Sequence, residues 1–380
     1  MILELLAWMM VYGPVALLVA YLFWVVKNLL LWKRAPHIPV KDNSIDVPFI
    51  SVIIPVRNEE DNILHVLKSL EMQDHPTSRF EVLVTDDFST DQTAERVHQF
   101  MFNTTMSVRW ISNSNGDAIG KKAALKRAID ASKGDIVLTT DADCLMGLHW
   151  IQSMARAFSS ADINMVTGFV KSQGGSTLMS RLEQLDQLVL SSVGATSVLS
   201  GKPVLCSGAN LAFRKQAFYE VGGYNYGAKD PSGDDTYLML RMIPHVRFNK
   251  NQNSLVTTRS QSDWKTIVQQ RIRWASKAKH YKEKRILAFG AFMTLLNLSP
   301  LVYLPFCFLN VEIFIAMVYW FSLKLIMDFL FVSPFARFSN QRGLLKTLPI
   351  YSLIYPIYIL MALFMIPFRG YEWKGRSYPK

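Results

Sequence analysis

Residues 49–56, with the sequence Phe-Ile-Ser-Val-Ile-Ile-Pro-Val, form a short apolar run rich in β-branched side chains. A continuous run of this length predicts a strand that is buried on both faces of a sheet. Further strands and helices are predicted to alternate after it, the strands at 80–85, 107–111 and 135–140 and the helices at 60–70, 91–102 and 121–131. This alternation predicts a largely parallel, doubly wound α/β sheet, which binds ligands at the carboxyl ends of its strands.

The apolar residues of the chain gather outside this α/β region. Half of the 380 residues are hydrophobic, and they crowd into residues 1–32 and 287–367. The first of these segments is too long for the apolar core of a signal peptide and long enough to span about 30 Å of hydrocarbon. Lys33, Arg34 and Lys41 follow it, so the positive-inside rule predicts that this flank and the α/β region are cytoplasmic. A buried core helix is the alternative, which the length and the flanking charge disfavour.

These patterns divide the chain into six parts. Residues 1–32 are predicted to form an N-terminal transmembrane helix, residues 33–47 a linker and residues 48–260 a cytoplasmic α/β domain. A basic interfacial helix is predicted at 261–285, C-terminal transmembrane or re-entrant helices at 286–368 and a basic tail at 369–380. The fifth part contains three apolar runs, at 287–308, 311–332 and 347–367. Three crossings would place the basic tail outside, so we expect one of these runs not to cross.

The net charge of +11 fits either a nucleic-acid partner or an anionic membrane surface. Because the positive residues lie beside the apolar segments, we expect a membrane partner and no nucleic acid. The three cysteines, Cys144, Cys206 and Cys307, are far apart and the histidines show no paired spacing, so neither a zinc site nor a disulfide framework is predicted.

Acidic side chains follow two of the predicted strands. Asp86 and Asp87 come after the strand at 80–85, and Asp141 and Asp143 come after the strand at 135–140. Two carboxylates spaced by one residue can bring their oxygens to one Mg²⁺ or Mn²⁺ ion, which commonly also binds substrate phosphate. Such an ion neutralises a diphosphate leaving group. Two solvated carboxylates in a turn are the alternative interpretation.

A second acidic pair, Asp234 and Asp235, follows Gly233 and precedes a predicted helix at 236–242. Aspartate is favoured as a helix N-cap, so capping is one interpretation of this pair. The other is a general base that takes the proton of an acceptor hydroxyl.

A Gln-Arg-Ile-Arg-Trp segment lies in the predicted basic helix. Gln270, Arg273 and Trp274 would share one helical face, where an amide, a guanidinium and an indole could hold a diphosphate and stack on a sugar. An interfacial helix with a basic face is the alternative. Both can hold, since five lysines surround the segment, namely Lys265, Lys277, Lys279, Lys282 and Lys284.

Together these elements resemble the inverting family 2 glycosyltransferases with the GT-A fold, in the membrane-bound subgroup with a D, DxD, D, QxxRW signature. This subgroup includes cellulose, chitin, hyaluronan and poly-N-acetylglucosamine synthases and ceramide glucosyltransferases. The resemblance covers about residues 49–275 and the closing residues 373–376. Four further segments carry it, SVIIPVRNEE at 51–60, TDDFSTDQT at 85–93, GKKAAL at 120–125 and SGANLAFR at 207–214. Phe88 stands where the family usually has glycine.

The resemblance implies a fold, a cofactor and a set of site residues. The fold would be an α/β, Rossmann-like GT-A domain with transmembrane α-helices, and the cofactor Mg²⁺ or Mn²⁺. Asp143 and Asp141 would bind the metal, and Asp235 would be the catalytic base, with Asp234 as the second choice. The nucleotide-sugar site would be formed by Glu59, Asp86, Asp87, Lys121, Asp141, Gln270, Arg273 and Trp274.

Two enzymatic functions fit these predictions. One is transfer of a sugar from a nucleotide-sugar, expected to be a UDP-sugar, to a lipid at the cytoplasmic membrane face. The other is a processive polysaccharide synthase that elongates and exports a glycan. About four membrane segments form a thin wall for an export channel unless the protein forms an oligomer or has a partner, which favours the lipid acceptor. A non-catalytic binding protein on the same fold is disfavoured because all the acidic positions and the QxxRW segment are intact.

Overall fold

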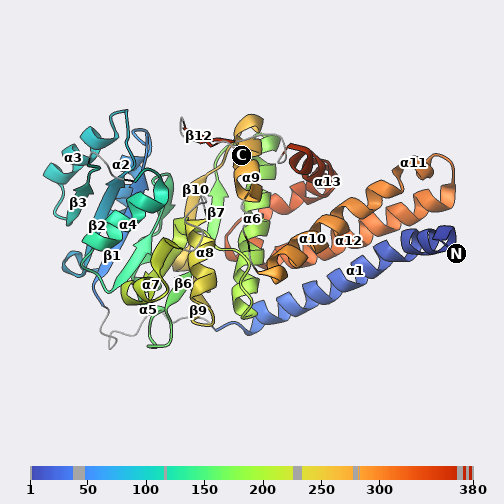
Figure 1. Ribbon diagram of the computed structural model, residues 1–380, viewed down its shortest axis with the longest axis horizontal. Coiled ribbons are helices and arrows are strands. Elements are labelled where there is room, and N and C mark those ends of the chain that lie inside the picture. Colours follow the sequence, from blue (N-terminus) through green and yellow to red (C-terminus); the bar gives the residue numbers. More distant parts are fainter. Residues whose placement is uncertain are drawn as a thin grey trace.

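The computed structural model describes residues 2–36, 48–114, 118–225, 233–276, 281, 283–365, 371–373 and 376–378. Figure 1 shows two parts, a sheet domain on one side and a group of long helices on the other. The helices α6 (Leu178–Leu199) and α9 (Trp264–Ser276) stand between these two parts. The site described below is formed where the two parts meet.

A seven-stranded sheet with the order β3-β2-β1-β4-β8-β6-β9 forms the centre of the domain. β1 (Ile50–Val56) pairs in parallel with β2 (Phe80–Asp86) and β4 (Ile136–Thr139), and β2 pairs in parallel with β3 (Val108–Ile111). The connecting helices are α2 (Ile63–Glu71), α3 (Thr93–Asn103) and α4 (Lys121–Ala131). The predicted alternation of strands and helices is therefore confirmed for this half of the sheet.

The other half of the sheet is mixed rather than parallel. β8 (Leu211–Arg214) is antiparallel to both β4 and β6 (Met165–Thr167), and β6 is parallel to β9 (Val246–Phe248). A smaller sheet contains β5 (Cys144–Met146), β10 (Val256–Arg259) and β7 (Val170–Gln173). The other helices of the domain are α5 (Trp150–Arg156), α6 (Leu178–Leu199), α7 (Lys215–Glu220), α8 (Asp234–Arg241) and α9 (Trp264–Ser276).

Four helical segments are long and apolar enough to span a membrane, namely Tyr12–Arg34, Lys284–Cys307, Val311–Phe338 and Arg342–Met361. They correspond to α1 (Ile2–Arg34), α10 (Lys284–Leu298) with α11 (Leu304–Cys307), α12 (Val311–Phe338) and α13 (Leu348–Met365). In Figure 1, α1 runs away from the sheet domain beside α10 and α12 and contacts both. α13 contacts α6 and α9 of the domain as well as α10 and α12.

The described residues within 261–285 do not form one continuous helix. α9 is described from Trp264 to Ser276, and Tyr281 and Glu283 are outside any helix before α10 begins at Lys284. Lys277, Lys279 and Lys282 of the predicted basic face lie outside the described residues.

Trp32 of α1 joins the long helices to the sheet domain. Its ring lies 4.4 Å from that of Phe335 in α12 and 6.0 Å from that of Phe248 in β9, measured between centroids. The Lys250 ammonium donates a hydrogen bond of 2.6 Å to the Trp32 carbonyl oxygen. Burying a large apolar side chain contributes about 1.5–3 kcal/mol. The helices and one face of the sheet therefore share a single core, which fixes the domain against the end of the helix bundle.

A polar cluster lies inside the helix bundle. The Asp328 carboxylate accepts hydrogen bonds from the Tyr21 hydroxyl at 2.8 Å, the Lys324 ammonium at 2.8 Å and the Ser352 hydroxyl at 3.2 Å. Charged groups among membrane helices are costly unless they are paired. Because these residues come from α1, α12 and α13, the cluster fixes the three helices relative to one another.

Candidate active site

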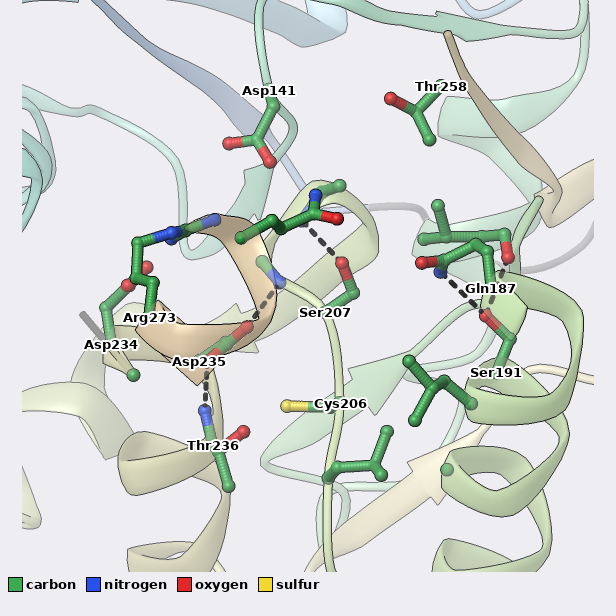
Figure 2. A pocket seen from close by; sticks show the side chains of 18 of the residues that line it. Asp141, Gln187, Ser191, Cys206, Ser207, Asp234, Asp235, Thr236, Thr258 and Arg273 are labelled. Carbon is green, nitrogen blue, oxygen red and sulfur yellow. Dashed lines mark hydrogen bonds between the residues drawn. The ribbon is translucent and has the colours of Figure 1, made fainter. Parts of the chain in front are cut away.

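The carboxyl ends of β1, β2 and β4 open onto a cavity of about 880 Å³. This volume is at the upper end of the range that small-molecule sites occupy. Most of the predicted site residues line it, namely Glu59, Asp87, Lys121, Asp141, Asp143, Asp234, Asp235, Gln270 and Arg273. Figure 2 shows Asp141, Arg273 and the Asp234–Asp235 pair on one side of this cavity, and Gln187, Ser191 and Thr258 on the other.

Among the predicted site residues whose side chains the structure describes, Asp86 does not line the cavity. The Asp86 carboxylate accepts hydrogen bonds from the Ser89 backbone N–H at 3.0 Å and from the Asn113 amide at 2.9 Å, so it holds the loop after β2. Trp274 belongs to α9, but its side chain lies outside the described residues. The predicted contacts of both side chains with the donor stay predictions.

Asp87 is the acid of the β2 end that reaches the cavity, although its residue is only 2 % exposed. The carboxylate accepts a hydrogen bond from the Gly120 N–H at 2.8 Å and another from Arg376 at 2.6 Å. Gly120 has a φ of 112°, which a residue with a side chain rarely adopts, and it directly precedes α4. Glycine at this position therefore brings a backbone donor to Asp87.

Phe88 keeps the backbone conformation that glycine adopts easily. Its φ is 60°, in the left-handed region, which costs a residue with a Cβ about 1–2 kcal/mol. The Arg57 guanidinium donates hydrogen bonds to the carbonyl oxygens of Asp87 at 2.7 Å and Phe88 at 2.8 Å, and these help to hold the turn. Phe88 therefore holds a backbone conformation that glycine would adopt at lower cost.

Asp141 and Asp143 line the cavity between β4 and β5 and differ in their partners. Asp141 forms an ion pair of 2.6 Å with Lys121, and Asp143 accepts a hydrogen bond of 3.1 Å from the Thr258 hydroxyl. The described part of the chain contains no group of three or more His, Cys, Asp or Glu residues arranged to hold a metal ion. Two hard carboxylate donors fit Mg²⁺ or Mn²⁺ when a nucleotide diphosphate supplies further oxygens, since Mg²⁺ is usually bound in this way.

Lys121 lies among three carboxylates. Burial alone would lower the pKa of its ammonium, but Asp141, Asp234 and Asp235 together raise that pKa above its ordinary value. The side chain therefore stays charged at neutral pH. It supplies positive charge between the two acidic pairs, where a phosphate group would need it.

Asp234 and Asp235 form the first turn of α8, and Gly233 takes the cap position in a left-handed conformation with φ 89°. The interpretation of these aspartates as N-cap residues is therefore wrong. The Asp235 carboxylate accepts hydrogen bonds from the Gly208 N–H at 3.0 Å and the Thr236 N–H at 2.6 Å. Asp234 is 8 % exposed, and Asp235 is more accessible. Two backbone donors thus fix Asp235 at the cavity wall.

α9 presents two faces with different roles. Gln270 and Arg273 line the cavity, as the helical spacing predicted. Arg271, one residue away, forms a buried ion pair with Asp186 of α6, which also accepts a hydrogen bond of 2.8 Å from the Tyr351 hydroxyl. Arg271 therefore anchors α9 to α6 and α13, and so positions Gln270 and Arg273.

The lining of the cavity also includes a largely apolar region contributed by α6, α10 and the segment after α6. We call this region the apolar lobe, and it is lined by Leu190, Ser191, Gly194, Cys206, Ile286, Phe289 and Gly290. A Cβ at Gly194 would lie 3.0 Å from the Leu205 side chain, so any larger residue would require Leu205 to shift. The sequence motifs gave no indication of the lobe. The small residues Gly194 and Gly290 inside apolar helices were the available signal.

The fold and the acidic residues at the strand ends define the class of protein, which is a glycosyltransferase domain with the GT-A fold. Residues 51–222 match the family model described as Glycosyl transferase family 2. The predictions of the fold class and of a glycosyltransferase are confirmed at this level.

The chain is also similar to individual curated proteins, at low sequence identity. The chain is 26% identical to the probable glycosyltransferase YdaM of Bacillus subtilis, over 62% of this chain and 56% of YdaM. It is 25% identical to a beta-monoglucosyldiacylglycerol synthase of Synechocystis, over 56% of this chain and 44% of that protein. The chain thus spans about half the length of the curated relatives it matches.

Among solved structures, the mannosyltransferase PcManGT of Pyrobaculum calidifontis, in complex with GDP-Man and Mn²⁺, superposes with a TM-score of 0.58 at 18% identity. The match covers 92% of this chain and 99% of PcManGT. The similarity therefore concerns the fold over nearly the whole chain.

Proposed function

We propose that this protein is an inverting, metal-dependent enzyme that transfers a sugar from a nucleotide-sugar, a UDP-sugar, to a lipid acceptor at the cytoplasmic membrane face. One observation carries the proposal. A single cavity joins the carboxylates at the ends of β2 and β4 to Phe289 and Gly290 of α10, and α10 belongs to a candidate membrane span.

The polar half of the cavity suits a nucleotide diphosphate. Lys121 and Arg273 supply positive charge and guanidinium donors, and Asp87 offers a fixed carboxylate for hydroxyl groups. When bound between Asp141 and Asp143, Mg²⁺ or Mn²⁺ would neutralise the negative charge that the departing diphosphate gains. Gln270 adds an amide on the same face of α9 as Arg273.

The apolar lobe suits the hydrocarbon part of a lipid. Each buried CH₂ group contributes about 0.8 kcal/mol, so a chain lying against Ile286 and Phe289 would gain affinity that a soluble sugar acceptor would not. The hydroxyl at the end of that chain would then reach Asp235, which can take its proton during attack on the anomeric carbon. One relative is named as a synthase of a sugar-bearing diacylglycerol, which supports this acceptor class.

The nature of the product tests the proposal directly. Full-length protein in lipid vesicles would be incubated with radiolabelled UDP-sugars and with GDP-mannose. We expect label to pass into the organic extract with a UDP-sugar. Label in a high-molecular-weight polymer would support the processive alternative instead, and the absence of transfer from every donor would contradict the proposed activity.

Filling the apolar lobe should weaken acceptor use alone. A Cβ at Gly290 would meet no atom within 4 Å, so Gly290→Trp can place its indole in the lobe. We expect the KM for the lipid acceptor to rise about 10-fold or more, because the indole removes most of the space for a hydrocarbon chain. Hydrolysis of the donor by water should continue near the wild-type rate, which can be measured as release of nucleotide diphosphate.

Gly13→Trp is the matched control for this variant. Gly13 lies in α1, has equally open space at its Cβ and does not line the cavity. An unchanged acceptor KM in Gly290→Trp, or an equal rise of the acceptor KM in Gly13→Trp, would contradict a role of the apolar lobe in acceptor binding.

A further inference from the structure

The chain returns to the donor side of the cavity at its carboxyl end. β11 (Tyr371–Trp373) lies against α9 and pairs antiparallel with β12 (Arg376–Tyr378). From β12, the Arg376 guanidinium donates one hydrogen bond to the Asp87 carboxylate at 2.6 Å and another to the Asp87 carbonyl oxygen at 3.1 Å. The two residues are 289 positions apart in the sequence.

We propose that Arg376 is a positioning residue of the donor site, which fixes the Asp87 carboxylate in the orientation that accepts the nucleotide. This inference rests on the proposed function. No residue of the carboxyl-terminal hairpin was among the predicted site residues, although residues 373–376 belonged to the resemblance.

The burial of the pair argues for a role in the site. The side chains of Arg376 and Asp87 are 17% and 3% exposed, so water does little to weaken their interaction. An arginine that served only to attach the hairpin could pair with any surface carboxylate. This one pairs with an acid that lines the cavity, and it also bonds the backbone of the same residue.

The other partners of Asp87 make the carboxylate orientation unique. One oxygen accepts from the Gly120 N–H at the start of α4, and the second accepts from Arg376. Arg57 fixes the carbonyl from a third direction. Without Arg376, the second oxygen loses its charged donor, and the carboxylate is free to turn toward the positive charge of Arg57 or Lys121. Its remaining acceptor positions would then no longer point consistently at the ligand.

The test uses full-length protein with Arg376→Ala, Arg376→Lys and the control Arg247→Ala. Arg247 also forms an ion pair, with Asp162, but its side chain is 50% exposed and it does not line the cavity. Loss of a hydrogen bond to a charged group changes an equilibrium about 10- to 100-fold. We therefore expect Arg376→Ala to raise both the dissociation constant of UDP, measured by calorimetry, and the donor KM at least 10-fold. The kcat and the acceptor KM should stay near wild type.

Arg376→Lys keeps the charge but not the two-point donor, so its UDP affinity should lie between those of wild type and Arg376→Ala. This variant decides the question if Arg376→Ala does not fold. Added guanidinium ion should restore UDP affinity to Arg376→Ala. Wild-type UDP affinity in a folded Arg376→Ala protein, or a loss confined to kcat, would overturn the inference. Failure of the wild-type protein to bind UDP would contradict the proposed donor instead.

Discussion

Asp235→Asn is expected to abolish sugar transfer while nucleotide binding stays within a few-fold of wild type. An inverting transfer requires the acceptor hydroxyl to lose its proton as it attacks the anomeric carbon, and a general base typically contributes about 10²–10⁴ in rate. Asparagine keeps the shape of the side chain but cannot take the proton. The donor would still be held by Asp87, Asp143 and the metal, so UDP affinity measured by calorimetry should change little.

The contacts of Asp235 indicate that the substitution removes the basicity of the side chain and keeps most of its position. Its two oxygens accept from the backbone N–H groups of Gly208 and Thr236, and the asparagine oxygen can keep one of these bonds. Asp234→Asn is the matched control, because the two side chains are adjacent in the first turn of α8 and both raise the pKa of Lys121. A tenth of the wild-type rate in Asp235→Asn, or a dead Asp234→Asn enzyme, would show that the base is assigned wrongly.

Removal of divalent metal is expected to stop turnover completely. EDTA should abolish activity, and either Mg²⁺ or Mn²⁺ should restore it, because the departing diphosphate needs a cation to neutralise its charge. Asp141 and Asp143 offer too few ligands to hold such an ion tightly alone. Mn²⁺ should therefore bind weakly to the free protein and much more tightly when UDP is present, which titration calorimetry can measure.

Asp143→Ala should reproduce the effect of EDTA at every metal concentration tested. Asp162→Ala is its control, since Asp162 is an exposed carboxylate that pairs with Arg247 away from the cavity. Full turnover of the wild-type enzyme in excess EDTA would remove the metal from the mechanism.

The parts of the fold that the sequence predicted are those with a local pattern. The strand at 49–56 and its neighbours are continuous apolar runs, and each was found within two residues of its observed bounds. The direction of β8 could not be predicted, because whether a strand runs parallel or antiparallel depends on the path of the intervening chain. Residues 140–210 contain α5, α6 and the short strands β5, β6 and β7, whose sequences carry no such pattern.

The candidate site also has features that the sequence could predict and features that it could not. The spacing of Gln270 and Arg273 predicted that they share one face of a helix, and both line the cavity, whereas Arg271 pairs with Asp186. The apolar lobe and the contact of Arg376 with Asp87 depend on residues that meet only in the folded chain. Leu190 and Phe289 resemble ordinary apolar helix residues, and no local pattern distinguishes an arginine in a tail that binds a carboxylate from one that is solvated.

The contact between Arg376 and Asp87 also limits how often the chain can pass through a membrane. α13 ends at Met365 and β11 begins at Tyr371 beside α9, and six residues extend at most about 20 Å, which is less than the hydrocarbon thickness of about 30 Å. Before α13, Gln341 donates a hydrogen bond of 2.8 Å to Ser172 of β7. Both ends of α13 are thus attached to the catalytic domain. If the apolar segments lie in a bilayer, α13 must enter and leave by the same face.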